Sequence, residues 1–335
     1  MILLVYGTRP EFIKISPLIN EMERQRIKFK TLFTGQHKDI VDGKADWTMS
    51  MEEKSNNRLD SIIKGCMNLT DEIFEGITHV LVQGDTTSVV GLALSALHRK
   101  IKIIHLEAGL RTHDTENPYP EENNRRIVSA IADIHLCPTW ENKINLIKEN
   151  IPDNKIFVVG NTGLDNLKFN KASIDYKNKV LITLHRRENH DMMDAWFNAI
   201  NSIARNNKHI EFIMPIHPNP NVQKHRDLLT DVNVVAPLTH DELITLLLQV
   251  VLVITDSGGI QEECSYLNKK CLVCRKVTER PESLGTTSFL VDSPDDLALA
   301  FFNNVYNPIP PRGTICPYGD GKASEKICKI FKNLP

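Results

Sequence analysis

Several features are missing from this 335-residue sequence, and each absence excludes a class of protein. There is no excess of basic residues, because 40 Lys and Arg stand against 42 Asp and Glu, so a nucleic-acid-binding surface is not expected. No apolar run reaches the roughly 18 residues that cross a bilayer, and the first residues lack the basic region of a signal peptide. We therefore expect a cytoplasmic protein that binds neither nucleic acid nor membrane.

The common short cofactor and catalytic motifs are missing too. GxGxxG, GxxxxGK followed by Ser or Thr, and GxSxG are all absent, which argues against a dinucleotide fingerprint, a Walker loop and a nucleophile elbow. There is no HExxH or Asp-rich loop. Among the seven cysteines only Cys271 and Cys274 form a CxxC, inside an apolar segment typical of a strand. We expect reduced, packed thiols, no metal and no bound cofactor.

What the sequence does contain is an alternation of short apolar runs with longer helical patterns. Apolar strands separated by helices indicate parallel sheets buried on both faces. Because the strands are too many for one compact sheet at this length, we predict an α/β protein of two doubly wound, Rossmann-like domains. The predicted strands are 2–6, 29–33, 79–83, 102–106, 155–159, 179–184, 211–215, 233–235, 250–255, 270–274 and 288–291, and the predicted helices include 86–97, 125–131, 192–205, 241–248 and 293–305.

The residues that follow the predicted strands are unusually polar. Ligands of open α/β sheets bind at the carboxyl ends of the strands, which is where these residues lie. Because both predicted domains carry such segments, we predict one active cleft between them. The segments are GTRPE from Gly7, GDTT from Gly84, EAGLR from Glu107, HRRE from His185, HPN from His217 and DSGG from Asp256.

Two of these segments have a structural and a functional interpretation. Thr8 and Glu11 have the spacing of a capping box at a helix start, while Arg9 beside exposed backbone amides would suit an anion. Pro17 follows closely, so we expect that helix to kink or restart there. In the DSGG segment, glycines before a helix favour a phosphate contact over a plain turn.

Titratable side chains gather at the same strand ends. A lone carboxylate in such a place is usually a helix cap. Several of them facing one cleft with arginines would suit general acid/base chemistry on an anionic substrate. The candidates are the carboxylates Asp85, Glu107, Glu121 and Glu122 and the histidines His185 and His217.

Taken together, the motifs resemble those of the non-hydrolysing UDP-N-acetylglucosamine 2-epimerases. They occur in the family's order and cover nearly the whole chain. The matching segments are GTRPEFIK (7–14), TGQH (34–37), QGDTT (83–87), HLEAGLRT (105–112), PYPEE (118–122) with Arg125, GNT (160–162), HRREN (185–189), HPNP (217–220), TDSGGIQEE (255–263), TERPE (278–282) and PYGDGKA (317–323).

The resemblance implies a GT-B-like fold and a homodimer. It implies an N-terminal domain (1–168) with the catalytic carboxylates and the dimer contact, a UDP-binding domain (169–322), and a last helix (323–335) that returns to the first domain. The implied catalytic residues are Asp85, Glu107, Glu121 and His185. The implied substrate-binding residues are Arg9, Lys14, Arg111, Arg125, His217, Ser257, Gly258, Gly259 and Glu263, of which Glu263 would hold the ribose hydroxyls.

The implied reaction is a cofactor-free, reversible C2 epimerisation of UDP-N-acetylglucosamine to UDP-N-acetylmannosamine. The C2 hydrogen is not acidic, because no carbonyl adjoins that carbon. Departure of UDP builds positive charge at C1, which acidifies C2 and gives a 2-acetamidoglucal. UDP then adds back while a proton arrives on the other face. Such a site needs cations and helix dipoles at the leaving phosphate and carboxylates near C1 and C2.

Departures from the family pattern leave alternatives open. Gln36 and His37 match part of the family's activating UDP-sugar site, but the downstream Gln-x-Leu stretch looks here like Asn57, Arg58 and Leu59, so activation by a UDP-sugar is left open. The alternatives are the same epimerisation of a UDP-linked 2-acetamido-2,6-dideoxy-L-hexose, a hydrolysing 2-epimerase that releases N-acetylmannosamine, a GT-B glycosyltransferase, and an inactive UDP-sugar-binding module. The PEFIK and EAGLR segments favour the non-hydrolysing class.

Overall fold

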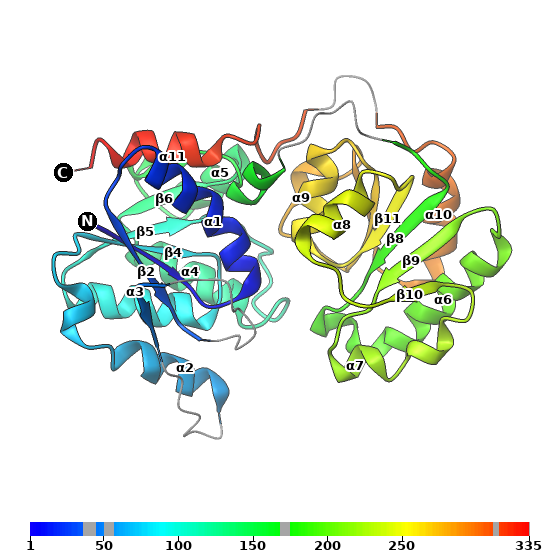
Figure 1. Cartoon of the computed structure of the whole chain (residues 1–335), viewed down its shortest axis with the longest axis horizontal. Coiled ribbons are helices and arrows are strands. Elements are labelled where there is room, and N and C mark those ends of the chain that lie inside the picture. The colour runs from blue at the N-terminus through cyan, green and yellow to red at the C-terminus, as the bar shows by residue number, and fades with distance from the viewer. Residues whose placement is uncertain (36–44, 50–56, 168–174, 311–314, 335) are drawn as a thin grey trace. The chain divides into compact units, whose positions relative to one another are not determined.

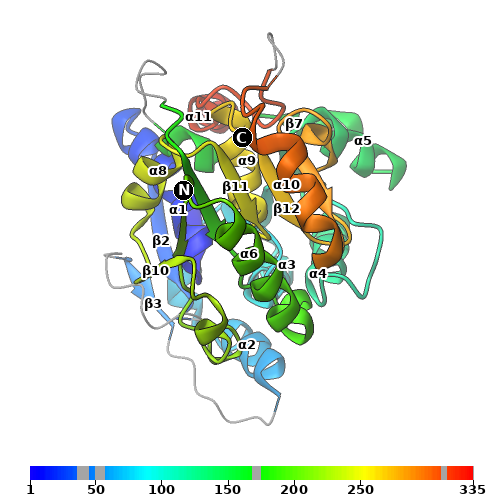
Figure 2. The same cartoon turned by 90° about the vertical axis from the view of Figure 1, so that its right-hand side faces the viewer.

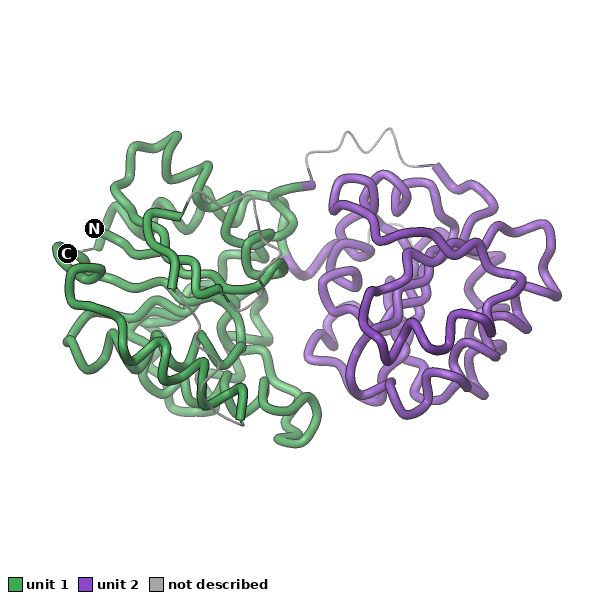
Figure 3. Tube along the Cα trace, turned by 60° about the horizontal axis from the view of Figure 1, so that its bottom comes forward, with its two compact units in different colours: residues 1–166, 319–335 green, residues 167–318 purple. Residues whose placement is uncertain are grey.

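We describe a computed structural model of the chain, covering residues 1–35, 45–49, 57–167, 175–310 and 315–334. The chain divides into two compact units (Figure 3). Unit 1 comprises residues 1–166 together with 319–335, and unit 2 comprises residues 167–318. Each unit has one sheet, and every strand pairing in both sheets is parallel.

Unit 1 holds a seven-stranded sheet in the order β3-β2-β1-β4-β5-β6-β7. Helices cover both faces of this sheet (Figure 1), as the continuous burial of its central strands requires. The elements are β1 (Ile2–Tyr6), α1 (Arg9–Arg24), β2 (Phe29–Phe33), β3 (Trp47–Thr48), α2 (Arg58–Met67), β4 (His79–Gln83), α3 (Thr87–His98), β5 (Lys102–Leu106), α4 (Glu121–Ile131), β6 (Ile134–Cys137), α5 (Trp140–Lys148), β7 (Ile156–Val158) and α11 (Ala323–Phe331), with 3-10 turns η1 (Asp71–Phe74), η2 (Asp153–Lys155) and η3 (Thr162–Asn166).

Unit 2 holds a six-stranded sheet in the order β10-β9-β8-β11-β12-β13. Its helices α6 and α10 lie side by side on one face (Figure 2), where Trp196, Phe197 and Phe301 fill the core. The elements are β8 (Lys179–Thr183), α6 (Met193–Asn206), β9 (Glu211–Pro215), α7 (Pro220–Gln223), β10 (Asn233–Val235), α8 (His240–Leu247), β11 (Leu252–Thr255), α9 (Gly258–Tyr266), β12 (Cys271–Cys274), β13 (Ser288–Val291) and α10 (Leu297–Val305), with 3-10 turns η5 (Arg187–Met192), η6 (Arg226–Leu228), η7 (Pro281–Ser283) and η8 (Pro294–Asp296).

Helix α1 does not restart at Pro17, which corrects that part of the expectation. The helix runs without interruption from Arg9 to Arg24, although Pro17 lacks the N–H that would bond the carbonyl of Ile13. Asn166 donates its Nδ2–H to that carbonyl at 2.7 Å, and the Ser16 hydroxyl approaches it at 3.3 Å. The freed carbonyl is therefore satisfied, and the helix continues through the proline.

Helix α11 is built into unit 1 although it comes last in the sequence (Figure 1). Ile327, Cys328 and Phe331 pack into the same core cluster as residues of α1. The Asp165 carboxylate accepts hydrogen bonds from the N–H groups of Ala323 at 3.0 Å and Ser324 at 2.6 Å. These bonds satisfy the first N–H groups of the helix, since Lys322 at the N-cap makes no such side-chain bond.

Candidate active site

The strand orders define one switch point in each sheet, where ligands of doubly wound folds bind. In unit 1, β1 lies beside β4, and the chain leaves these strands in opposite lateral directions. The loops that follow them carry Arg9 and Asp85. In unit 2, β8 lies beside β11, and the following loops carry His185 and Ser257. The sequence-predicted residues thus belong to two switch points, and each is described within its own unit.

Glu107 follows β5 and is clamped by two side chains. The Lys14 ammonium contacts one carboxylate oxygen, and the Gln83 amide donates to the other. Glu107 has a left-handed backbone, with φ +66°, which side chains other than glycine rarely adopt. Two of the predicted residues, Lys14 and Glu107, therefore form one group.

Asp85 follows β4 and is paired with Arg125 of α4. Arg125 donates from Nη2 at 2.6 Å and from Nε at 2.9 Å to Oδ2 of Asp85. The same guanidinium donates at 3.1 Å to Glu122, which is fully buried. Because the Arg125 side chain is only 5% exposed and engages both carboxylates, it orients Asp85 rather than standing free for a phosphate.

Three further predicted residues of unit 1 differ in their surroundings. Arg9 is exposed in the first turn of α1, and Glu121 is the first residue of α4 and partly exposed. The Arg111 guanidinium is fully enclosed and binds Glu149 through two bonds of 2.7 Å, as well as Ser129 at 2.9 Å. These contacts hold Arg111 inside unit 1, and its substrate contact stays a prediction.

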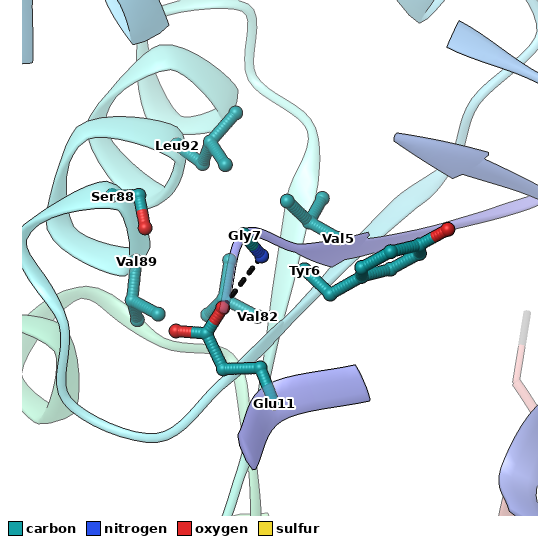
Figure 4. Close-up of a pocket in the computed structure, with 8 residues that line it drawn as sticks. All are labelled: Val5, Tyr6, Gly7, Glu11, Val82, Ser88, Val89 and Leu92. Atoms are coloured by element: carbon teal, nitrogen blue, oxygen red, sulfur yellow. Dashed lines mark hydrogen bonds between the residues drawn. The ribbon is translucent and has the colours of Figure 1, made fainter. Parts of the chain in front are cut away.

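Glu11 joins the two loops of the switch point in unit 1. Its Oε2 accepts hydrogen bonds from the N–H groups of Gly7 at 2.6 Å and Thr8 at 2.9 Å, and its Oε1 accepts one from the Thr86 hydroxyl at 2.8 Å. Burial raises the pKa of this carboxyl, while these donors oppose the rise. Figure 4 shows Glu11 beside a hollow lined by Val82 and Leu92, which is too narrow to admit a water molecule.

In unit 2, His185 lies against His217 and Asp256. The imidazole rings of His185 and His217 stack with centroids 5.0 Å apart and an interplanar angle of 13°. The Asp256 carboxylate is completely buried and accepts the N–H groups of His185 and Arg186. Burial lowers the pKa of His185, whereas the charge of Asp256 opposes this effect.

The N-terminus of α9 supplies the expected anion-binding groups. Ser257 is the N-cap, and Gly258 and Gly259 begin the helix. A Cβ on Gly258 would lie 2.3 Å from Nη1 of Arg280, so this position has room only for glycine unless the arginine moves. Glu263, one turn further along, accepts a bond of 3.0 Å from His240 if Nε2 of that ring carries the proton.

Sequence reasoning did not single out the side chains of Gln83 and Asp256. Gln83 ends β4 directly before the glycine of the GDTT segment, and only its contact with Glu107 shows its role. Asp256 begins the DSGG segment predicted to contact phosphate, and its buried carboxylate binds the loop after β8. Gln36 and His37 lie outside the described residues, so the activating site stays a prediction. Within the described ranges, no group of three or more His, Cys, Asp or Glu could hold a metal ion, and no helix is long and apolar enough to cross a membrane.

Two parallel, doubly wound units in one chain define a GT-B-like α/β protein, which confirms the predicted fold class. The family described as UDP-N-acetylglucosamine 2-epimerase matches residues 20–332. A relative of that name from Campylobacter jejuni is 36% identical over 98% of this chain and 97% of its own, and one from Neisseria meningitidis is 34% identical over 99% of both. The chain belongs to the UDP-N-acetylglucosamine 2-epimerase family.

Solved structures support the same assignment. The UDP-GlcNAc 2-epimerase of N. meningitidis, bound to UDP-GlcNAc, matches with a TM-score of 0.90 at 34% identity, covering 99% of this chain and 100% of that one. The enzyme of Methanocaldococcus jannaschii, in complex with UDP-GlcNAc and UDP, matches with a TM-score of 0.83 at 29% identity over 99% of both chains.

Proposed function

We propose that this chain catalyses the reversible C2 epimerisation of UDP-N-acetylglucosamine to UDP-N-acetylmannosamine. The observation that carries the proposal is family membership over nearly the whole chain, together with a relative of TM-score 0.90 that is bound to UDP-GlcNAc. The division of groups between the units agrees with it. Unit 1 supplies carboxylates with fixed cations, and unit 2 supplies a helix N-terminus and histidines.

In the proposed elimination, a base removes the C2 proton and the C1–O bond breaks. The electron pair of the C2–H bond forms the C1=C2 bond, and the pair of the C1–O bond leaves with UDP. We assign the acid and base roles to Asp85, Glu107, Glu121 and His185 as a set. The Lys14 and Gln83 contacts keep Glu107 an acceptor in a fixed place, which is what proton transfer at a defined carbon needs.

The departing diphosphate carries negative charge that the protein must stabilise. We assign this task to the N–H groups at Ser257, Gly258 and Gly259, where the α9 dipole is positive, and to Arg9 and His217. Glu263 would bind the ribose hydroxyls. In the return step the UDP oxygen adds to C1 and a proton reaches C2 on the opposite face, so atoms and charge balance over the cycle.

We also propose that the chain acts as a homodimer. Unit 1 exposes Trp140, Ile144 and Ile147 at four- and three-residue spacing on α5, with 68%, 40% and 44% of each residue accessible. Such an apolar stripe on a helix suits contact with a second copy. Light scattering after size exclusion is expected to give twice 38.0 kDa, and a monomer mass would contradict the proposal. Cytoplasmic location stays a prediction.

The activity is tested by incubating the purified chain with UDP-N-acetylglucosamine and following products by proton NMR. An equilibrium mixture with UDP-N-acetylmannosamine is expected. Free N-acetylmannosamine with UDP would assign the chain to the hydrolysing enzymes instead. If neither forms, with or without added activating UDP-sugar, the proposed substrate is wrong, and the UDP-linked 6-deoxy-L-hexose is then tested in the same assay.

A further inference from the structure

Asp256 has a buried carboxylate, and a carboxylate does not serve to bind a phosphate. It stands at the end of β11, directly before the glycine-led start of α9, yet its side chain is 0% exposed. Its Oδ2 accepts hydrogen bonds from the His185 N–H at 2.9 Å, the Arg186 N–H at 2.8 Å and the Asn189 amide at 3.1 Å. Asp256 therefore fixes the loop after β8 across the switch point of unit 2.

The second carboxylate oxygen of Asp256 does not bind the loop after β8. Oδ1 is buried and makes no hydrogen bond to any residue that the structure describes, and it lies 3.6 Å from Nδ1 of His185. A buried carboxylate oxygen without a donor is destabilising, and the imidazole Nδ1 is the donor that faces it. An N–H···O hydrogen bond spans about 2.7–3.2 Å, so the two groups would need to approach by about 0.4 Å or more to form one.

We propose that Asp256 is the positioning residue of His185. Its Oδ1 accepts the Nδ1–H of the ring, so that the neutral ring keeps Nε2 unprotonated and directed toward the substrate. The carboxylate also stabilises the imidazolium that forms when Nε2 takes up a proton. The use of Nε2 on substrate rests on the proposed function, whereas the Nδ1–H tautomer is a property of the chain itself.

Two other groups around His185, Arg186 and His190, act in the opposite direction. The His217 ring stacks on it, the Arg186 charge lies in the same loop, and His190 contacts the His185 carbonyl through Nε2 at 3.2 Å. His217 accepts the Asn219 N–H at its Nδ1, 3.2 Å away, so the neutral form of that ring is already supported. Asp256 is thus the carboxylate that favours a proton on His185 against Arg186 and His190, while His217 contributes a stacked ring.

The test uses the full chain labelled with ¹⁵N-histidine, with the His185 signal assigned through His185→Gln. Wild type is expected to show the Nδ1–H tautomer of His185. In Asp256→Asn the amide oxygen takes over the two backbone N–H groups, which directs the NH₂ group at Nδ1 and forces the Nε2–H tautomer. We expect kcat to fall by about 100-fold or more, KM for UDP-N-acetylglucosamine to change by less than about threefold, and the acidic limb of the pH profile to move to lower pH.

Glu262→Gln is the matched control. It also removes one buried negative charge in unit 2, but that carboxylate faces Arg280 and not a histidine. Its His185 tautomer is expected to match wild type. An Nε2–H tautomer in wild type would overturn the proposal, as would Asp256→Asn with the wild-type tautomer and pH profile. If the variant fails to fold, the wild-type tautomer decides. If wild type does not epimerise, the proposed function fails while the tautomer result still stands.

Discussion

At each of the two switch points a buried carboxylate holds the loops together by hydrogen bonds, and the residue that does so differs between the units. In unit 1, Glu11 accepts two backbone N–H groups of the first loop and a hydroxyl of the second. In unit 2, Asp256 accepts two backbone N–H groups and the Asn189 amide. Each buried carboxylate thereby joins loops that the sheet brings together: Glu11 connects its own loop to the distant Thr86, and all three partners of Asp256 are distant in sequence.

The difference between them concerns what lies around the carboxylate. Beside Glu11, unit 1 presents acids with fixed cations, namely Glu107 with Lys14 and Asp85 with Arg125. Beside Asp256, unit 2 presents backbone N–H groups and stacked histidines. The comparison teaches that a buried carboxylate connects the two loops of each switch point, beside ion-paired carboxylates in unit 1 and beside histidines and a helix N-terminus in unit 2. Substitutions in either unit test this difference.

The largest effect is expected from the acids of unit 1. Glu107→Gln or Asp85→Asn removes a proton acceptor without touching unit 2, so kcat is expected to fall by about 10³-fold or more. Calorimetry is expected to give UDP affinity within about threefold of wild type. The exposed Glu116→Gln serves as the control for surface charge. Epimerisation at a near-wild-type rate by either active-site variant would remove that residue from the catalytic set.

A second prediction addresses the N-terminus of α9 in unit 2, where we propose that the diphosphate binds. Gly258→Ala places a Cβ against Arg280, which is tied to Glu262 and Glu279. We expect UDP affinity to fall about tenfold and Tm to drop, since overpacking typically costs 1–3 kcal/mol. Gly259→Ala is the contrast, because its nearest neighbour would be the Ser257 hydroxyl at 3.9 Å, and its Tm is expected to stay unchanged. Equal Tm values for the two variants would contradict this explanation.

A smaller effect separates two arginines that the sequence had grouped together. Arg9→Ala removes an exposed cation, so UDP affinity is expected to fall several-fold with no change in Tm. Arg111→Lys breaks the paired contact with Glu149 inside unit 1 and is expected to lower Tm. Calorimetry with UDP and thermal unfolding check both. An unchanged affinity in Arg9→Ala would exclude Arg9 from the site.

The smallest effect concerns acid stability. His105 precedes the Glu107 clamp in β5, and burial lowers its pKa to about 4 from the ordinary 6.5. The unfolded chain therefore binds the proton first, and stability is lost as pH falls from 6.5 toward 4. Between pH 7.5 and 5.5 we expect a loss of about 1 kcal/mol from this residue. Denaturant unfolding of His105→Gln is expected to show a correspondingly flatter pH dependence, whereas an identical slope would refute it.

Much of the architecture could be predicted because buried parallel strands are continuous apolar runs. The range of β1 matches the prediction, as do those of β4 and β5. The short strand β6 was missed, since its four residues include the buried His135. Helix α4 begins at Glu121, earlier than the predicted 125, because its first turn is polar.

The site could be predicted only as residue types at strand ends. Sequence spacing does not show which partner meets which side chain across the fold. Asn166 satisfies the carbonyl freed by Pro17, and Glu149 encloses Arg111, but both partners are distant in sequence. The Asp256 carboxylate likewise binds the N–H of His185, which follows the neighbouring strand β8 and is distant in sequence.

The most direct test of the account is turnover of UDP-N-acetylglucosamine by the wild-type chain in D₂O, with proton NMR and mass spectrometry of the products. If acids of unit 1 exchange the C2 proton with solvent while UDP is released and recaptured, UDP-N-acetylmannosamine will carry one deuterium at C2. UDP-N-acetylmannosamine that keeps its original C2 hydrogen would contradict the elimination and the proton chemistry assigned to unit 1.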